Sequence, residues 1–375
     1  MKSSDILAAE ELCTVGREGR FLVVELLKPH RVLCTSAHGG GQREDLRYLV
    51  NHQSCEGRGH QERLRRLKRL GEADYHRETC AEMGLDPDSV ALLGTAANMN
   101  HAVLTREEFA GIQVRAVVTA GVEGNAGRAG DAARWHEGEE GWNQIDPQVG
   151  TINVLLHIDW PLTPAAIAQA AITLTEAKTS ALQELAVSSR FSPNLATGTG
   201  TDQYAIAAPI DPRAPKTNTG HHAKLGELIG RAVRRATREA LLWQNGLEPS
   251  RTRSIPYALR RFDLDEPRLM AALKERLDED SYALLDQNRL AVLWEPGAAA
   301  AAFAFAAVWD RVRYGVLPPS HAAGTLRQQA AVLASCLAAR PDSWPLCWRE
   351  LEVDPGDPMQ VVVDAVALGW KLKWT

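Results

Sequence analysis

The sequence predicts an α+β or mixed α/β fold, with a layered sheet-and-helix N-terminal domain and a smaller, mainly helical C-terminal part. Short strand-like runs alternate with longer helical runs before residue 245, but without the strict strand–helix–strand rhythm of a doubly wound parallel sheet. Near residues 245–250 the composition changes, and the chain beyond has few Gly/Thr loops and many alanine, leucine and tryptophan residues at helical spacings. We therefore expect two domains, 1–245 and 250–375, the second of unknown role.

Two short strand-like runs open the first domain, at residues 22–27 and 31–36. Residues 28–30, Lys-Pro-His, predict a turn between them, because proline presets a turn backbone, and the glycine-rich loop 38–41 ends this strand pair. Further strands are predicted from short apolar runs at residues 46–50, 89–94, 113–121, 151–158 and 204–208.

Helix signals lie between and after these strands. Thr163 precedes Pro164 and a long alanine-rich run, and this pairing of N-cap and first helical residue predicts a helix that ends near residue 185. Other helices are expected within residues 61–84, 224–243 and about 266–280. An alanine run and two tryptophan-rich patches of the C-terminal part occupy residues 298–302, 344–348 and 370–374.

Bulk composition excludes several classes of protein. The 375 residues carry 42 basic and 47 acidic side chains, which are mostly interspersed, so no general field attracts nucleic acid or an anionic membrane. The longest apolar run, residues 297–308, is too short to span a bilayer, and the acidic N-terminal residues do not resemble a secretory signal. Six cysteines without a CxxC pair are typical of free thiols in a reducing compartment. We expect a cytoplasmic protein without nucleic-acid partner or membrane insertion, and the oligomeric state stays open.

The densest group of reactive side chains follows a Gly/Thr turn. Residues 197–202 read Thr-Gly-Thr-Gly-Thr-Asp and end on Asp202. A second block about twenty residues later carries His221, His222, Lys224 and Glu227. Carboxylates, imidazoles and an ammonium within one short span are the groups that hydrolysis needs. The sequence therefore predicts an active-site rim here.

A second candidate follows the strand at residues 113–121. Residues 121–130 hold four glycines, which let a backbone approach a ligand closely, and Asn125, Arg128 and Asp131 add an amide, a cationic fork and a carboxylate. The pattern favours a binding loop, and a tight loop in which Arg128 and Asp131 pair is the structural alternative.

Polar side chains at two other places are candidates for substrate contacts. Asn51, His52 and Gln53 end a strand and suit an orienting hydrogen-bond network, although His52 is equally typical of a buried structural histidine. Glu176 and Lys178 lie two residues apart on a helix, so they point to different faces and at most one reaches a common site.

The histidines carry no metal signature. His221 and His222 are adjacent, and neighbouring side chains diverge on a helix or a strand, so they do not chelate one ion together. With no HExxH motif present, we predict no dedicated protein-bound metal, while dependence on a divalent metal stays open.

Six blocks of the chain, taken in order, resemble the adenosylcobinamide amidohydrolase family. They are residues 51–53, 119–131, 150–153, 175–179, 198–202 and 224–229. No single block is specific, but their order is, and the resemblance covers roughly residues 20–235, or about 60% of the chain. It implies hydrolysis of the amide that joins an aminopropanol arm to a propionyl side chain of the corrin ring. The product would be adenosylcobyric acid, in cobalamin salvage and remodelling.

On this resemblance a corrinoid is the substrate, and its cobalt need not take part. Hydrolysis of a secondary amide needs a base, a donor for the tetrahedral oxyanion and an acid for the leaving amine. We expect Asp202 or Glu227 as the base, Lys224 or the amides of the Gly/Thr turn as the oxyanion partner, and His222 or His221 as the acid. The predicted substrate-binding residues are Asn51, His52, Asn125, Arg128, Asp131, Lys178 and Thr199. Cobinamide, its phosphate and a complete cobamide all stay open as the preferred substrate.

Two other functions fit the same residues. In an N-terminal-nucleophile hydrolase, Thr199 or Thr201 would be a nucleophile exposed by self-cleavage, and the purified chain would then run below its full mass. A non-enzymatic corrinoid carrier would need only polar loops and a concave pocket, and turnover of adenosylcobinamide would exclude it.

Overall fold

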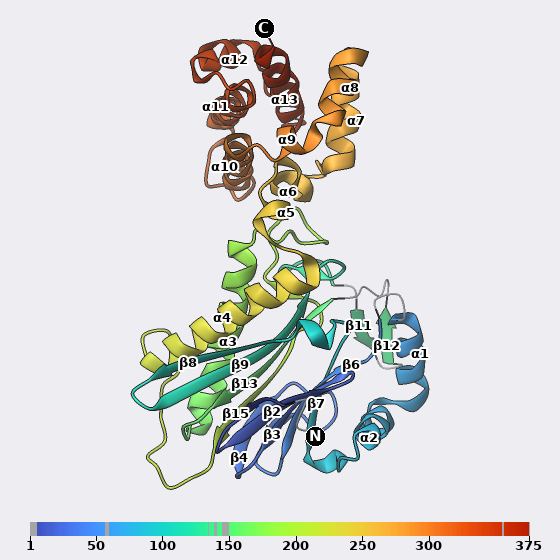
Figure 1. The fold of residues 1–375 in the computed structure, drawn as a ribbon, viewed down its shortest axis with the longest axis vertical. Helices are drawn as coiled ribbons and strands as arrows, with labels where there is room; N and C mark the ends of the chain where they lie inside the picture. Colours follow the sequence, from blue (N-terminus) through green and yellow to red (C-terminus); the bar gives the residue numbers. More distant parts are fainter. Residues whose placement is uncertain are drawn as a thin grey trace. The chain divides into compact units, whose positions relative to one another are not determined.

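The chain forms two compact units, Met1–Gly246 and Leu247–Thr375. The computed structural model describes residues 6–56, 60–133, 135–138, 141–144, 150–354 and 356–374. Within these residues the first unit combines strands with helices, and the second unit is helical (Figure 1). The mixed sheet-and-helix class with a helical C-terminal part, which the sequence predicts, is thereby confirmed.

Two large sheets contain most of the described strands of the first unit. Sheet A has the strand order β1-β2-β3-β6-β7, and sheet B has the order β5-β4-β15-β13-β9-β8. Neighbouring strands are antiparallel, except that β6 and β7 are parallel and β13 and β15 are parallel. Two short pairs, β10 with β14 and β11 with β12, complete the pairing. The strands are β1 Ile6–Ala9, β2 Cys13–Glu18, β3 Phe21–Leu26, β4 His30–Cys34, β5 Gly41–Arg43, β6 Tyr48–Gln53, β7 Val90–Thr95, β8 Val103–Phe109, β9 Ile112–Gly121, β10 Ala126–Gly127, β11 Trp135–Gly138, β12 Gly141–Gln144, β13 Thr151–Ile158, β14 Gly198–Thr199 and β15 Gln203–Pro209.

Helices connect the two parallel pairs, because a parallel connection must cross back over the sheet. The connection from β6 to β7 contains α1 (His60–Leu70) and α2 (Glu72–Glu82), and the connection from β13 to β15 contains α3 (Pro164–Glu184). The predicted cap of α3 is confirmed, since the Thr163 side chain accepts a hydrogen bond from the Ala166 N–H. The last helix of the unit, α4 (Lys224–Asn245), packs against β8, β9 and α3 (Figure 1).

The two sheets pack face to face around one apolar core. Leu49 and Leu93 of sheet A belong to the same buried cluster as Val117 and Leu155 of sheet B. Successive side chains of a strand point to opposite faces, so Val50 joins a different cluster, on the side of sheet A that α2 covers. The layers are therefore helix, sheet A, sheet B and helix, with α3 and α4 on the outer face of sheet B.

One prediction about local elements needs correction. Residues 22–27 and 31–36 do form strands, but β3 and β4 are not a pair, because the turn at residues 28–30 carries the chain from sheet A to sheet B. The helices expected within residues 61–84 are confirmed as α1 and α2, which Gly71, with φ of 77°, separates.

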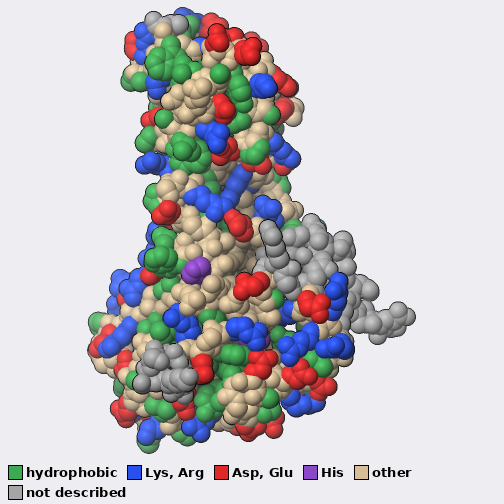
Figure 2. Space-filling model, turned by 45° about the vertical axis from the view of Figure 1, so that its right-hand side comes forward, with side chains coloured by type: hydrophobic (Ala, Val, Ile, Leu, Met, Phe, Trp, Pro, Cys, Tyr) green, Lys and Arg blue, Asp and Glu red, His purple; other side chains and the backbone are tan. Residues whose placement is uncertain are grey.

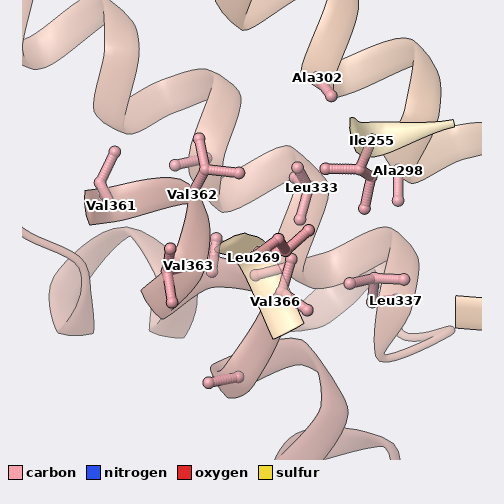
Figure 3. Packing of buried hydrophobic residues seen from close by; sticks show 14 of the residues in the cluster. Ile255, Leu269, Ala298, Ala302, Leu333, Leu337, Val361, Val362, Val363 and Val366 are labelled. Atoms are coloured by element: carbon pink, nitrogen blue, oxygen red, sulfur yellow. The ribbon is translucent and has the colours of Figure 1, made fainter. Parts of the chain in front are cut away.

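The second unit has its own apolar core. Val362 and Val366 of α13, Leu333 and Leu337 of α11 and Ala302 of α10 belong to one buried cluster (Figure 3). The predicted helix at 266–280 is divided into α7 and α8, because the Asp278 side chain caps a new helix. No described helix is both long and apolar enough to cross a membrane. The helices are α5 Pro249–Thr252, α6 Ile255–Leu259, α7 Glu266–Arg276, α8 Glu279–Gln287, α9 Arg289–Leu293, α10 Pro296–Arg313, α11 Pro319–Leu337, α12 Trp344–Glu350 and α13 Gln360–Lys373.

Charged side chains on the surface occur mostly as neighbours of opposite sign. On the face that Figure 2 shows, Lys and Arg side chains are interspersed with Asp and Glu side chains. The arginines of α4 are an example, since Arg234 and Arg238 pair with Glu184 and Arg235 pairs with Glu107.

A directed chain of hydrogen bonds closes the interface between the sheets at one end. Arg115 Nη1 donates to His157 Nδ1 (3.3 Å), His157 Nε2 to His30 Nε2 (3.1 Å), and His30 Nδ1 to the Lys28 carbonyl (2.8 Å). Because the arginine can only donate and the carbonyl can only accept, these contacts assign one neutral tautomer to each imidazole. Arg115 also forms an ion pair with Glu10 (3.1 Å), so the chain links sheet B to the turn before β2. Burial lowers the pKa of both histidines.

His52 is buried on the outer face of sheet A. Its ring stacks on Phe21, with 4.6 Å between the ring centroids, and neither ring nitrogen has a hydrogen-bond partner among the described residues. Burial, aided by the positive charges of Arg20, Arg63 and Arg66, lowers the pKa of His52 from 6.5 to about 3. His52 is therefore neutral in the folded protein near neutral pH.

Acid should destabilise the first unit through these histidines. Above pH 6.5 His52 is neutral in both states, whereas between pH 6.5 and about 3 only the unfolded chain takes up its proton. Its contribution to stability is thus complete above pH 6.5 and falls by up to about 1.4 kcal/mol per pH unit on acidification. Urea unfolding should be monitored by hydrogen exchange of the β6 amides at pH 6.5 and at pH 5. Between these two pH values the free energy of unfolding of His52→Leu should fall by about 2 kcal/mol less than that of wild type. The exposed His222→Gln is the matched control, and an equal effect of both variants would contradict this account.

Candidate functional site

Asp202 ties three segments of the first unit together. Its Oδ1 accepts hydrogen bonds from the Ile152 N–H (2.8 Å) and the Thr199 hydroxyl (2.6 Å). Its Oδ2 accepts from the Thr199 N–H (2.9 Å) and forms an ion pair with Lys178 Nζ. The Asp202 and Lys178 side chains are only 16% and 9% exposed, so this ion pair is largely shielded from water. We call Lys178, Thr199 and Asp202 the Asp202 centre.

Local sequence explains how these groups meet. The alternating Gly/Thr turn lets β14 form a two-residue pair with β10, which brings the turn against the end of β13. A side chain at position 198 would displace the ion pair, because a Cβ there would lie 2.5 Å from Asp202 Oδ2 and 2.8 Å from Lys178 Nζ. Lys178 reaches the carboxylate from the buried face of α3.

A second set of polar contacts holds the exposed tip of the turn. The Thr201 hydroxyl donates to the Gly150 carbonyl (2.8 Å), and Asn125 Nδ2 donates to the same oxygen (3.0 Å). The Thr151 hydroxyl donates to the Thr201 carbonyl (2.5 Å). Asn125 thus lies beside the Gly/Thr turn, as a binding residue of this centre would.

A buried amide network continues from this centre into the space between the sheets. Asn153 Nδ2 donates to Asn51 Oδ1 (2.9 Å) and to the Gly94 carbonyl (3.1 Å). Asn51 Nδ2 in turn donates to the Thr119 hydroxyl (2.7 Å). Gln203 belongs to the same network, since its Oε1 accepts from the Gly94 N–H (2.9 Å). These bonds join sheet A to sheet B at the end opposite to the His30–His157 chain.

Arg128 and Asp131 hold their loop against residues 187–199. The Asp131 carboxylate accepts from the Arg128 N–H (2.8 Å) and the Ser189 hydroxyl (2.6 Å), and Arg128 Nη1 donates weakly to the Leu195 carbonyl (3.4 Å). Partial burial alone would raise the pKa of Asp131, but the hydrogen bonds it accepts hold that pKa below its usual range. Both side chains therefore have structural partners, and they flank β10 next to the Gly/Thr turn.

The other predicted catalytic residues lie at the N-terminal end of α4. Glu227 pairs with Lys224 and with Arg231 (2.8 Å), and the hydrogen bond from Lys224 is the main reason that the pKa of Glu227 is lowered. The His221 ring contacts the Glu176 carboxylate on the exposed face of α3, and His222 is exposed.

The strand register shows that this second group and Asp202 are far apart. The Lys224 ammonium lies 4.8 Å from the Phe109 ring centroid, at the turn between β8 and β9. Asp202 instead contacts Ile152, which pairs with Ala120 near the far end of β9. A ten-residue strand is roughly 30 Å long. The structure therefore brings Asp202 together with Lys178 and Thr199, and does not bring it together with Glu227, Lys224 or His222.

Asn51 and His52 also separate. Asn51 faces sheet B and joins the amide network, whereas His52 faces the helices on the other side of sheet A. Strand geometry alone requires this divergence, because neighbouring side chains alternate between faces.

Four polar residues of this region are not among the site residues predicted from the sequence, although the first three lie in blocks that resemble the family: Thr119, Thr151, Asn153 and Gln203. The signal was present, since the run 151–158 is apolar except at Thr151, Asn153 and His157, and all three side chains are buried. A polar residue at alternate positions of an otherwise apolar strand marks a hydrogen-bonded inner face.

The described residues contain no cluster of three or more His, Cys, Asp or Glu side chains arranged to hold a metal ion. What the Asp202 centre offers instead is a carboxylate, an ammonium and a hydroxyl in direct contact. These groups can move a proton and stabilise charge at an adjacent polar bond.

Comparison with known proteins covers this whole region. A protein of Methanocaldococcus jannaschii, whose name describes it as uncharacterized, is 33% identical over 247 residues, which are 64% of this chain and 92% of that relative. Residues 5–249 match the family model described as adenosylcobinamide amidohydrolase, somewhat beyond the range 20–235 over which the motifs resemble it. The resemblance drawn from the six blocks is confirmed, and the chain belongs to the adenosylcobinamide amidohydrolase family.

Proposed function

We propose that this protein hydrolyses the amide between the corrin-ring propionyl side chain and the aminopropanol arm of adenosylcobinamide. The products are adenosylcobyric acid and the amino alcohol. The family supports the substrate class, and the Asp202 centre, which lies inside the matched residues, supports the chemistry. The observation that carries the proposal is the contact of one shielded carboxylate with both an ammonium and a hydroxyl.

Within this proposal Asp202 is the general base. The hydrogen bonds from the Ile152 N–H to Oδ1 and from Lys178 to Oδ2 fix the orientation of the Asp202 carboxylate. Lys178 supplies positive charge next to the place where negative charge develops on the amide oxygen, and the exposed backbone of Gly200 and Thr201 can approach the same atom. Glu227, with two cationic partners at the other end of β9, is the weaker candidate for the base.

The corrinoid itself would be held around the Gly/Thr turn. Thr199 belongs to the turn and Asn125 lies beside it, and both can contact the peripheral amides of a corrin ring. Arg128 and Asp131 follow β10, which pairs with β14 of the same turn. Asn51 is linked to this region by its hydrogen bond with Asn153. We propose that residues 1–245 carry out catalysis and that residues 250–375 are an extension outside the reaction chemistry.

The first prediction of this proposal is the reaction itself. Purified protein incubated with adenosylcobinamide should release aminopropanol and form adenosylcobyric acid. In heavy-oxygen water, mass spectrometry should find one labelled oxygen in the new carboxylate, because hydrolysis puts one solvent oxygen there. Intact substrate after long incubation with and without added divalent metals would contradict the proposal and favour a corrinoid carrier.

The second prediction separates the two carboxylates. Asp202→Asn keeps the shape but cannot accept a proton, so its turnover should fall by roughly 10²- to 10⁴-fold. Glu227→Gln is the matched control and should stay near wild type, because Glu227 lies far from Asp202. Circular dichroism and thermal melts must show both variants folded. A large loss in Glu227→Gln with near-normal turnover in Asp202→Asn would move the base to the N-terminus of α4.

A further inference from the structure

We propose that Thr199 is the nucleophile of the Asp202 centre, and that its side-chain oxygen carries the corrinoid acyl group as an ester during turnover. This inference rests on the proposed amide hydrolysis and deepens it by naming the attacking atom. It starts from the number of hydrogen bonds that Asp202 already accepts.

The acceptor positions of Asp202 are filled. An ionised carboxylate offers about four lone-pair sites. Among the described residues, four donors take them: the N–H groups of Ile152 and Thr199, the Lys178 ammonium and the Thr199 hydroxyl. A water molecule could bind this carboxylate only by displacing one of them. Asp202 is therefore badly placed to activate water directly.

Of the four donors, one is an oxygen nucleophile. Amide nitrogens and an ammonium do not attack a carbonyl carbon, whereas a hydroxyl that gives its proton to a neighbouring carboxylate does. The Thr199 Oγ1 to Asp202 Oδ1 distance of 2.6 Å is that of a charge-assisted O–H···O⁻ hydrogen bond, so the proton already lies on its transfer path.

The surroundings hold the pair in the arrangement that an activated nucleophile needs. Activated nucleophiles contact a base that a third group orients, and here the Ile152 N–H and Lys178 orient Asp202. Thr199 is fixed twice, because its own N–H also donates to the carboxylate. It is half-buried beside Gly200, which is exposed and carries no side chain that would block an incoming amide.

The step balances without any further reactant. Thr199 Oγ1 forms a bond to the amide carbon while its proton moves to Asp202. The C–N bond then breaks, the leaving nitrogen takes that proton, and aminopropanol departs. Water enters the position left by the amine, attacks the ester and gives a proton back through Asp202 to Thr199 Oγ1. The net change is amide plus water to carboxylic acid plus amine, which ionise to carboxylate and ammonium.

This arrangement differs from that of a self-cleaving hydrolase. There the base is the free amino group of the nucleophile itself. In this proposal the base is the Asp202 side chain, which accepts from the Thr199 hydroxyl, so no free amino group at residue 199 is needed. The active chain should therefore keep its full mass.

The test uses the full-length protein and three variants. Thr199→Val removes the hydroxyl at nearly constant shape, and Thr199→Ser keeps it. Thr179→Val is the matched control, since it removes another hydroxyl that contacts the same turn, through the Thr197 carbonyl (2.8 Å). Turnover, circular dichroism and products formed with added hydroxylamine are measured for each. Single-turnover reactions quenched in acid are digested and searched for an acylated peptide.

Wild type and Thr199→Ser should give a corrinoid acyl adduct on the peptide that contains residue 199, and hydroxylamine should divert part of the product to the hydroxamate. Thr199→Val should lose both signals and about 10³-fold or more in turnover, whereas Thr179→Val should keep them. Turnover of Thr199→Val above about a tenth of wild type overturns the inference, as does a wild type that yields free acid alone in hydroxylamine. If Thr199→Val does not fold, the acyl adduct and the hydroxamate from wild type and Thr199→Ser test the inference. Their presence supports it, and their absence overturns it. Absence of any product from wild type overturns the proposed function instead, and this inference with it.

Discussion

The packing of sheet A against sheet B is the constraint from which the rest of the first unit follows. A side chain on the shared face must be apolar or must find a hydrogen-bond partner there, because water does not reach it. On β13 and β9 this gives three levels: His157 beside Arg115, Leu155 beside Val117 and Asn153 beside Thr119. The middle level is apolar, and the outer levels are polar.

The two polar ends of this interface have different chemical character. At one end the directed chain from Arg115 to Lys28 leaves both imidazoles neutral and fully partnered, which suits a structural role. At the other end the Asn51–Asn153 network leads outward, through Thr151, to the Gly/Thr turn. The reactive centre therefore lies where the hydrogen-bonded interior opens toward an exposed loop.

Disruption of the ion pair between Lys178 and Asp202 should destabilise the folded first unit. Removal of one partner from a buried ion pair commonly costs about 3–5 kcal/mol, since the other charge is left without compensation. Such a pair alone is weak evidence of stabilisation, but it fixes geometry. Because Asp202 is held from β13, α3 and β14 together, the position of the Thr199 hydroxyl depends on all three elements.

Much of the site was visible along the chain. The sequence predicts Asp202 and Thr199 as site residues, because a Gly/Thr turn with an acid at its end lies within six residues, and residues this close in sequence stay close in the folded chain. The sequence predicts Lys178 only as a substrate-binding residue, since nothing in a helix sequence tells which of its faces will meet a turn twenty residues later. Glu227, Lys224 and His222 are near Asp202 in sequence but not in space, because β15 and the loop of residues 210–223 carry the chain along sheet B to the Phe109 end before α4 begins.

By itself, the sequence determined the fold class, most strands and long helices, the change of character near residue 245 and the family. These features depend on periodicity, turn chemistry and motif order, which are properties of short segments. Tertiary structure alone decided that β3 and β4 lie in different sheets, that Asn51 and His52 face opposite layers, and that Lys178 rather than Lys224 meets Asp202. The physical reason is that strand pairing and the packing of helices on sheets join residues distant in the chain. Such contacts are set by the burial of whole faces, which no local pattern encodes.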